Sequence, residues 1–475
     1  MLIAVQPETE SRRKIKVLGK DYAVDGWTNA TEAILSKTGS NLINIPSHPL
    51  SIVKEQIYKS FPNFAYYEKI DPVVSTFDNF ESLCFPKDHP GRSKTDTYYI
   101  NQDMLLRTHS SAHQMEILKA GSQINGLNNE PRSKHLLGLA RNLEASLNNE
   151  RFLVAADVYR RDEIDASHYP VFHQMEGVAT FDRKRLAEEA KESENIRNGI
   201  IKRENESKAS GGGGNKLEVV TEDDTQISKD NPIQGEHSPE EVQILIKDMK
   251  ESMNIMVASV LGMGSTITAE NSRNSKNASS SGPQKLPVRW IEAYFPFTSP
   301  SWEMEVWFQG KWLEICGCGI VQQSIMERSG RPDRVGWAFG FGLERLAMIL
   351  FGIPDIRLFW SKDPRFLDQF QPGKISTFKS FSRHPACTKD VSFWLPSDAQ
   401  FHENDFMDTV REIAGDLAED VKLIDKFKHP KTGKTSHCYR INYCSMDRNV
   451  TNEEINKIQN ELRQVVTDKF GVELR

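Results

Sequence analysis

A continuous hydrophobic run, a highly charged loop and an alternating run follow one another in the first half of the chain. Phe152 to Tyr159 reads FLVAADVY, which has the length and composition of a buried strand. After the charged loop, Tyr169–Pro170 turns the chain, because proline fixes φ and restricts the residue before it. The next run, 171–180, alternates, so Phe172, Gln174 and Glu176 share one strand face. The pattern predicts a β-hairpin.

The loop of this hairpin, residues 160–170, is called the charged loop below. The guanidinium groups of Arg160 and Arg161 are planar and permanently charged, and they can bind phosphate oxygens. The loop is therefore suited to binding a polyanion. A surface hairpin with ordinary ion pairs explains the same pattern and stays open as the alternative.

Helical spacing predicts further elements on both sides of the hairpin. Residues 46–61 form an amphipathic pattern, and 239–261 repeat apolar residues at helical intervals. Ser110 and Ser111 suit the N-cap of a helix over 112–120, whose free N–H groups could meet an anion or simply cap the helix. Residues 336–352, GWAFGFGLERLAMILFG, read as a strand followed by a helix. They lack the third glycine of a dinucleotide-binding turn, which argues against such a site.

Two phenylalanines flank a proline in the run VRWIEAYFPFTSPSWEMEVWF, residues 288–308. Strand alternation predicts that the rings of Phe295 and Phe297 lie on one face. Such a pair belongs either to the core or to a slot for a third ring.

The composition changes between residues 203 and 286. Four glycines at 211–214 and the run NSRNSKNASSSG predict a largely disordered insertion with one helix, because such sequences bury too little apolar surface. No Gly-Lys-Ser/Thr follows the glycines, which excludes a P-loop.

A separate unit is predicted for residues 383–475. Strand, helix, two strands and a second helix follow in order, with a short end strand, as in a split βαβ sandwich. Lysines gather near its central loop, HPKTGKTS, which either binds RNA or is an ordinary surface loop.

Overall composition is that of a soluble protein of two or three domains. The 475 residues are 38% hydrophobic and 27% charged, with a net charge of −6. Six scattered cysteines favour free thiols over a disulfide framework, and no apolar run reaches membrane-spanning length. Residues 1–45 are mixed and polar, and we expect an N-terminal extension.

The hairpin resembles motif 2 of the class II aminoacyl-tRNA synthetases, in the form typical of phenylalanyl-tRNA synthetases. Tyr159-Arg160-Arg161-Asp162 follows the motif, and HYPVFHQMEG points to the phenylalanine enzymes. The segment with Pro72 resembles motif 1, and Gly340-x-Gly342 with Arg345 resembles motif 3. Phe-Pro-Phe-Thr at 295–298 is similar to the family's substrate pocket, and residues 383–475 resemble its ferredoxin-like anticodon-binding domain, whose fusion to the core is typical of the mitochondrial single-chain enzyme.

The resemblance implies an α+β fold: a class II synthetase antiparallel sheet flanked by helices over residues 46–370, plus the ferredoxin-like domain over 383–475. It implies an enzyme that activates L-phenylalanine with ATP and Mg²⁺ and transfers it to tRNA(Phe). By analogy, we expect a monomer in the mitochondrial matrix, without membrane attachment. No stretch resembles the family's editing domain, so we expect the rejection of tyrosine to depend on the synthetic pocket.

Site roles follow from the same resemblance. It implies three catalytic residues: Arg160, Arg345 and Glu314. ATP binding is implied for Arg160, Asp162, His168, Phe172, Glu314 and Arg345, with Glu314 also the metal residue. Amino-acid binding is implied for His109, Ser111, His113, Gln174, Glu176, Phe295, Phe297, Ala338 and Phe339. In the C-terminal unit, tRNA binding is implied for Lys428, Lys431 and Lys434. Two rivals remain: a relative that activates another amino acid, such as phosphoserine, and a non-catalytic RNA-binding paralogue.

Overall fold

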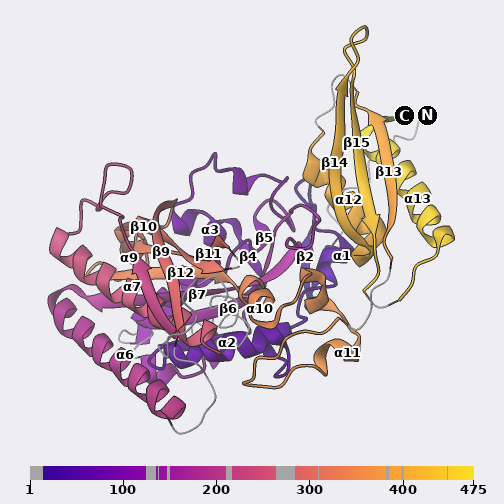
Figure 1. The fold of residues 1–475 in the computed structure, drawn as a ribbon. Helices are drawn as coiled ribbons and strands as arrows, with labels where there is room; N and C mark the ends of the chain where they lie inside the picture. Colours follow the sequence, from indigo (N-terminus) through magenta and orange to yellow (C-terminus); the bar gives the residue numbers. More distant parts are fainter. Residues whose placement is uncertain are drawn as a thin grey trace, which may run out of the picture.

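The structure is a computed structural model that describes residues 14–124, 135–136, 138–146, 150–209, 217–263, 284–308, 310–380, 385–396, 401–446 and 448–475. Figure 1 shows two units: a larger one around a broad sheet, and a smaller one formed by the C-terminal part of the chain. The charged loop belongs to the larger unit and lies between β6 (Arg151–Tyr159) and β7 (Val171–Asp182), where the two units meet.

An eight-stranded sheet organises the larger unit. Four of its strands, in spatial order, are β3 (Ala65–Tyr67), β6 (Arg151–Tyr159), β7 (Val171–Asp182) and β12 (Arg334–Gly342), and the order continues with β11 (Lys311–Val321), β10 (Thr298–Phe308), β9 (Gln284–Phe295) and β8 (Leu217–Glu222). Pairs from β6 to β9 are antiparallel, whereas β3 and β8 join the edges in parallel. The predicted antiparallel-rich α+β class is confirmed.

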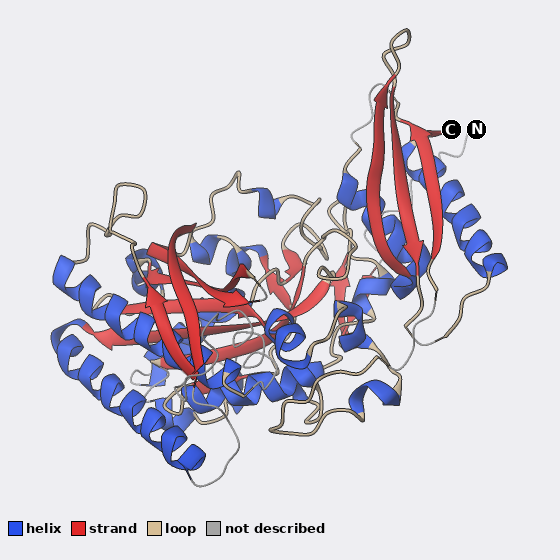
Figure 2. Ribbon diagram, viewed as in Figure 1, coloured by secondary structure: helices blue, strands red, loops and turns tan. Residues whose placement is uncertain are grey.

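Helices cover both faces of this sheet (Figure 2). Trp337, Phe339 and Phe341 of β12 point into the larger core, which is shared with α2 (Pro49–Ser60), α7 (Pro239–Leu261) and α10 (Leu343–Phe351). Ala338 belongs to the core on the other face, with α4 (Gln114–Ile124) and α9 (Gln323–Arg328). This strand alternation decides which residues can reach the site.

Short elements complete the larger unit. They comprise β4 (Val73–Ser75), β5 (Met104–Leu106), α3 (Thr76–Asn79), α11 (Pro364–Leu367) and the 3₁₀ turns Leu42–Asn44, Glu81–Leu83, Pro90–Arg92, Ser110–His113, Leu143–Ser146, Arg183–Arg185 and Ile356–Trp360.

The described part of the expected N-terminal extension, 14–45, is folded onto the larger unit. It forms β1 (Lys14–Val17), β2 (Lys20–Ala23) and α1 (Glu32–Leu35). Val17, Ile34 and Ile43 are buried in the core that contains α2. Residues 14–45 are therefore part of the larger unit and do not form a separate extension. Its few apolar residues are too widely spaced for a periodic signal, and tertiary packing orders them.

The described part of the expected insertion, 203–286, contains more structure than the single predicted helix. The helix α7 is as predicted, but α6 (Leu186–Ala209) continues into the segment and β8 adds a strand to the sheet edge. Arg197 of α6 bonds Asp248 and Glu251 of α7, which holds the two helices together. The four glycines and the serine- and asparagine-rich run lie outside the described residues.

The C-terminal unit has the predicted order of elements. It contains β13 (Cys387–Trp394), α12 (Glu403–Ala414), β14 (Ala418–Lys428), β15 (Thr435–Tyr443), α13 (Asn452–Phe470) and β16 (Glu473–Leu474), with a 3₁₀ turn at Gly415–Leu417. The sheet order is β14-β15-β13-β16, and the two helices pack on one face over a separate core. The β14–β15 hairpin projects away from the larger unit (Figure 1).

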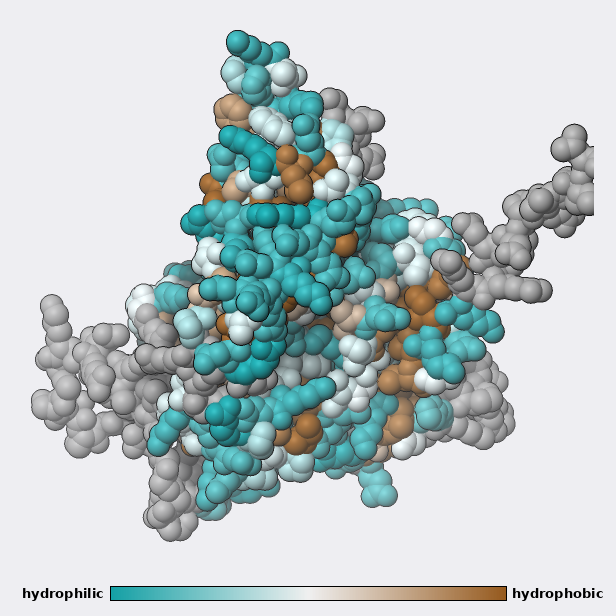
Figure 3. Space-filling view, turned by 90° about the vertical axis from the view of Figure 1, so that its right-hand side faces the viewer, coloured by the Kyte–Doolittle hydropathy of each residue, from teal (hydrophilic) through white to brown (hydrophobic). Residues whose placement is uncertain are grey.

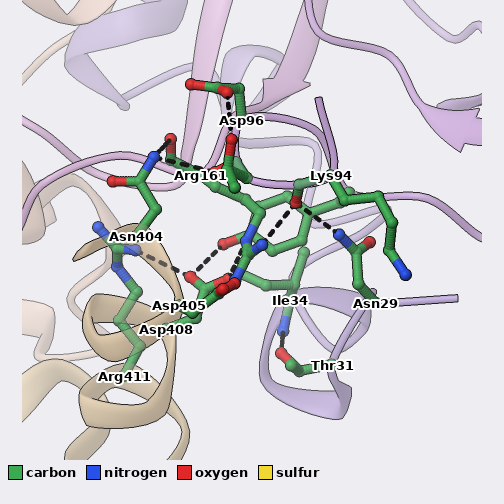
Figure 4. A network of polar contacts seen from close by, with 12 residues as sticks. Asn29, Thr31, Ile34, Lys94, Asp96, Arg161, Asn404, Asp405, Asp408 and Arg411 are labelled. Carbon is green, nitrogen blue, oxygen red and sulfur yellow. Dashed lines mark hydrogen bonds and ion pairs between the residues drawn. The ribbon is translucent and has the colours of Figure 1, made fainter. Parts of the chain in front are cut away.

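The two units meet at the charged loop (Figure 4). Arg161 pairs with Asp408 and Asp405 of α12 at 2.5 and 2.7 Å. Arg411 donates to the backbone oxygens of Asp162 and Glu163. The C-terminal unit therefore bonds backbone oxygens of the charged loop and also pairs with the charged side chain of Arg161.

Hydrophilic residues cover most of the face drawn in Figure 3, with hydrophobic residues in small groups. Among the described residues, no helix combines the length and apolar character that crossing a membrane requires.

Candidate active site

A cavity of about 570 Å³ opens on the face of the sheet that carries Ala338. Its walls come from β7, β11, β12, the β9–β10 turn, the start of α10, the charged loop and the segment 85–114. This volume is in the range of small-molecule sites. The predicted site residues that line it are Arg160, Asp162, His168, Phe172, Glu314, Arg345, His109, Ser111, Gln174, Glu176, Phe295, Phe297, Ala338 and Phe339.

Two parallel rings form one end of the cavity. Phe295 is the last residue of β9 and Phe297 lies in the turn before β10; their ring centroids are 5.8 Å apart and the planes differ by 14°. Phe85 lies 6.0 Å from Phe297. A Cβ at Gly317 would come within 2.5 Å of the Phe295 ring, so a side chain there would displace it. The rings share one face because a turn places them there, whereas strand alternation was the predicted reason.

The floor beneath the rings is small. Ala338 is 5% exposed and Gly340 follows it on the same face of β12. The ring of Phe339 packs in the core on the opposite face, 5.4 Å from Phe61. We therefore expect Phe339 to support the floor rather than to contact a ligand with its ring.

Several polar atoms beside the floor have no hydrogen-bond partner within the described protein. Within the described residues, Glu176 Oε1, both ring nitrogens of His109 and both amide atoms of Gln114 are buried without a hydrogen bond. Burial raises the pKa of Glu176 to about 8, although Ser111 opposes this, and burial next to Arg160 lowers that of His109 to about 3. Unpaired buried polar groups are costly, so this end is suited to a polar ligand.

Gln114 is a cavity residue that the sequence reasoning missed, whereas His113 was assigned wrongly. His113 does not line the cavity; its ring is held by Arg107 at 2.9 Å and Glu116 at 2.7 Å. The expected helix begins two residues earlier, as the 3₁₀ turn Ser110–His113, which directs Gln114 to the cavity and His113 away.

Charged and aromatic groups line the end of the cavity that contains the charged loop. The guanidinium of Arg160 lies 5.2 Å from the centre of the Phe172 ring, and its Nε donates to Thr108 O at 2.8 Å. Arg345 pairs with Glu314 at 3.6 Å. For His168, partial burial opposes charging, but the hydrogen bond that its ring donates to Asp165 and the nearby acids raise its pKa overall. This end is suited to phosphate groups.

The cavity contains further residues that no motif indicated. Tyr294 lines it and is 73% exposed, and Glu344 lines it while accepting from His173 N and Nδ1. Phe85 and His89, from the segment that precedes β5, also line the cavity.

Glu314 fits a hard cation. Its carboxylate is half exposed in the cavity, and Mg²⁺ binds proteins through one or two carboxylates together with substrate phosphates. Partial burial first, and then Glu314, raise the pKa of Glu303, a repulsion that a cation would relieve. A separate cluster, Glu163, Asp165 and His168, lies in the charged loop and is internally bonded.

The three predicted tRNA-binding lysines lie in the C-terminal unit, at and beside the tip of the β14–β15 hairpin. All are exposed, and Lys434 pairs with Glu473 at 3.0 Å. Leu423, Ile424 and Phe427 are also partly exposed on β14. The hairpin thus presents both cations and apolar groups to solvent.

Comparisons with known proteins agree with this geometry. The model for tRNA synthetases class II core domain (F) matches residues 35–191 and 274–370, and the ferredoxin-fold anticodon binding domain matches 382–475. The mitochondrial phenylalanine–tRNA ligase of Saccharomyces cerevisiae is 44% identical over 97% of this chain and 95% of its own length. The mitochondrial ligases of Mus musculus and Rattus norvegicus are 41% and 39% identical, over 97% and 98% of this chain and 89% and 90% of their own. The chain therefore belongs to the mitochondrial phenylalanine–tRNA ligases, a family of class II aminoacyl-tRNA synthetases.

Proposed function

We propose that the cavity binds L-phenylalanine and ATP, joins them as an adenylate, and transfers the phenylalanyl group to the 3′ end of tRNA(Phe). The observation that carries this proposal is that a paired-ring slot and a guanidinium-lined cleft share one cavity. The names of the relatives support action in the mitochondrion, and we propose the matrix as the compartment and the monomer as the working form.

The amino acid would lie with its phenyl ring between the Phe295–Phe297 pair and Ala338. Offset or edge contacts between rings add to the apolar burial. Its ammonium and carboxylate would take the unpaired positions of Glu176, His109 and Gln114, with Gln174 and Ser111 close by. Gln174 already has one fixed bond, because its Oε1 accepts from Ser110 N at 3.2 Å.

The nucleotide would lie at the opposite end. Phe172 and Arg345 are suited to the two faces of an adenine, Asp162 to its amino group, Arg160 to the α-phosphate, and His168 to the outer phosphates. The phenylalanine carboxylate oxygen attacks the α-phosphorus, the bond to the bridging oxygen breaks, and pyrophosphate leaves. The side chains supply positioning and charge neutralisation rather than covalent chemistry.

When bound beside Glu314, Mg²⁺ would supply positive charge against the phosphate oxygens. The tRNA would then provide a terminal ribose hydroxyl that attacks the adenylate carbonyl and releases AMP. We propose that the part of the tRNA far from its 3′ end contacts the exposed β14–β15 hairpin. The contact would be made through Lys428, Lys431 and Lys434.

Aminoacylation of unfractionated mitochondrial tRNA by the full-length protein tests the proposal. We expect phenylalanine on one isoacceptor group, identified by mass spectrometry after nuclease digestion, and no product with Arg160→Ala. Attachment of another amino acid would support the rival enzyme, although the apolar slot disfavours a charged side chain such as phosphoserine. Binding of tRNA without any product would support the non-catalytic paralogue.

A further inference from the structure

A polar segment of the insertion contacts the turn that carries the aromatic slot. We call Asn231, Pro232 and Gln234 the insertion clasp. These residues lie between β8 and α7, in a region that the class II core model does not cover. They carry no apolar periodicity, yet Asn231 is only 4% exposed.

Asn231 bonds both backbone groups of one residue in β10. Its Nδ2 donates to Ser301 O at 2.8 Å, and its Oδ1 accepts from Ser301 N at 2.7 Å. The pairing of β10 with both neighbouring strands is irregular between Thr298 and Ser301. Asn231 therefore acts as an extra strand partner where the ladder is interrupted.

Gln234 joins the start of β10 to the end of β11. Its Nε2 donates to Ser299 O at 2.7 Å and to Val321 O at 3.1 Å, and its Oε1 accepts from Gln323 N at 2.7 Å. Ser299 Oγ also donates to Pro232 O at 2.7 Å. Two strands that flank the slot are thus tied to each other through one insertion side chain.

The tied residues are directly connected to the slot. Phe297 precedes Thr298 in the chain, and its carbonyl oxygen accepts from Gln322 N at 3.0 Å, next to the Gln323 N–H that Gln234 holds. The Thr298 and Ser301 hydroxyls lie 2.7 Å apart. The Phe297 ring thus projects from backbone whose carbonyl is bonded by Gln322, the neighbour of a residue that Gln234 bonds.

We infer that Asn231 and Gln234 are positioning residues for the phenylalanine slot: they act through the β9–β10 turn to hold the Phe297 ring at the distance a substrate phenyl group requires. The inference rests on the proposed function, because it takes the Phe295–Phe297 pair as the side-chain site. It gives the insertion a role in substrate selection, beyond adding a strand and helices to the fold.

The test measures ATP–pyrophosphate exchange with full-length Asn231→Ala and Gln234→Ala. Loss of a buried hydrogen bond at the turn should raise KM for phenylalanine by roughly fivefold or more, with KM for ATP unchanged. The preference for phenylalanine over methionine and leucine should fall, because a displaced ring no longer selects a flat side chain. A merely structural defect would lower the active fraction for every substrate alike.

Gln56→Ala is the matched control. Gln56 is a half-buried amide on α2 that donates to Ser259 Oγ of α7 at 2.9 Å, so it also joins the insertion to the core, but away from the slot. We expect both KM values to stay unchanged there. If Asn231→Ala does not fold, Gln234→Ala decides, since its side chain is only half-buried.

Phe297→Leu tests the aromatic slot independently of the insertion clasp. If this variant raises KM for phenylalanine while folded clasp variants leave both KM and selectivity unchanged, the inference is overturned and the proposed function stands. If Phe297→Leu also leaves KM unchanged, the slot itself is wrong and the inference is overturned with it. Equal changes in KM for ATP and phenylalanine in the clasp variants would likewise overturn it.

Discussion

Arg345 and Glu314 form an ion pair in the lining of the cavity. Their side chains lie 3.6 Å apart, and the Arg345 guanidinium also donates to Glu314 O at 3.2 Å. Each side chain is about half exposed, so the pair should contribute only about 0–1 kcal/mol to folding. The proposed nucleotide would offer Arg345 a stronger partner, and the proposed cation would do the same for Glu314.

Arg345→Ala should therefore affect catalysis far more than stability. We expect the exchange rate to fall roughly 10²-fold or more, as for loss of a transition-state donor, with the melting temperature nearly unchanged. Arg440→Ala is the control, because Arg440 pairs with Asp390 at 2.9 Å on the surface of the C-terminal unit. A large drop in melting temperature, or unchanged exchange, would count against the assignment.

Ala338→Gly should enlarge the floor of the slot. Ala338 lies on the cavity face of β12, and removing its methyl group leaves room beyond the para position of a bound phenyl ring. We expect the variant to activate para-chloro- and para-bromophenylalanine, which the parent protein should reject, as measured by exchange.

Ala179→Gly provides the matched comparison for this prediction. Ala179 is buried in β7 on the opposite face of the same sheet, so the same methyl group is lost without opening the cavity. If both variants, or neither, accept the larger substrates, then Ala338 is not the floor.

Glu176 should impose a pH dependence on phenylalanine binding. Burial raises the pKa of its carboxyl to about 8, so the free protein holds it neutral at pH 7. Pairing with an ammonium requires the ionised form, and its fraction rises as the pH rises towards 8. We expect kcat/KM for phenylalanine to increase between roughly pH 6.5 and pH 8. This increase should be absent in Glu176→Gln.

With the pKa of Glu176 raised, a rise in pH lowers the stability of the fold, whereas it favours phenylalanine binding over the same range. Because the folded protein retains this proton where the unfolded chain has lost it, the contribution of Glu176 to stability falls as the pH rises from the ordinary carboxyl pKa towards 8. Glu176→Gln should remove that slope. An identical pH profile in the variant and the parent would show that another group titrates.

Asp408 should link domain docking to activity. It is buried, accepts from Arg161 at 2.5 Å and from Tyr98 Oη at 2.8 Å, and also pairs with Arg411 (Figure 4). Removing one partner of a buried ion pair costs about 3–5 kcal/mol. We expect Asp408→Ala to lower the unfolding free energy by about this amount, and to slow exchange because the charged loop also carries Arg160.

Asp390→Ala tests whether this effect is specific to the interface. It removes an exposed partner of Arg440 in the same unit and should change stability by less than about 1 kcal/mol. Equal destabilisation by the two substitutions in chemical denaturation would contradict the proposed role of Asp408.

Some of the site could be predicted because strand geometry makes it periodic. Phe172, Gln174 and Glu176 alternate along β7, and all three line the cavity as expected. Helix α7 begins and ends where its proline and apolar spacing indicate. In the C-terminal unit, the strand and helix patterns predicted the order of all its strands and α-helices along the chain.

Other parts depend on tertiary contacts that leave no periodic signal. Whether His113 or Gln114 reaches the cavity is decided by a 3₁₀ turn that begins two residues before the expected helix. Asn231 and Gln234 bond backbone groups far away in sequence, so their composition resembles that of an ordinary loop. Residues 14–45 fold because α2 offers an apolar surface, which their own spacing does not reveal.

Amino-acid-dependent ATP–pyrophosphate exchange by the purified full-length protein, run with each of the twenty amino acids and with phosphoserine, tests the central claim most directly. The slot between the Phe295–Phe297 pair and Ala338 predicts the fastest exchange with L-phenylalanine. Tyrosine should be slower by roughly 10²-fold, since an apolar pocket rejects one added hydroxyl only weakly. Faster exchange with any other amino acid, or none with phenylalanine, would contradict the account.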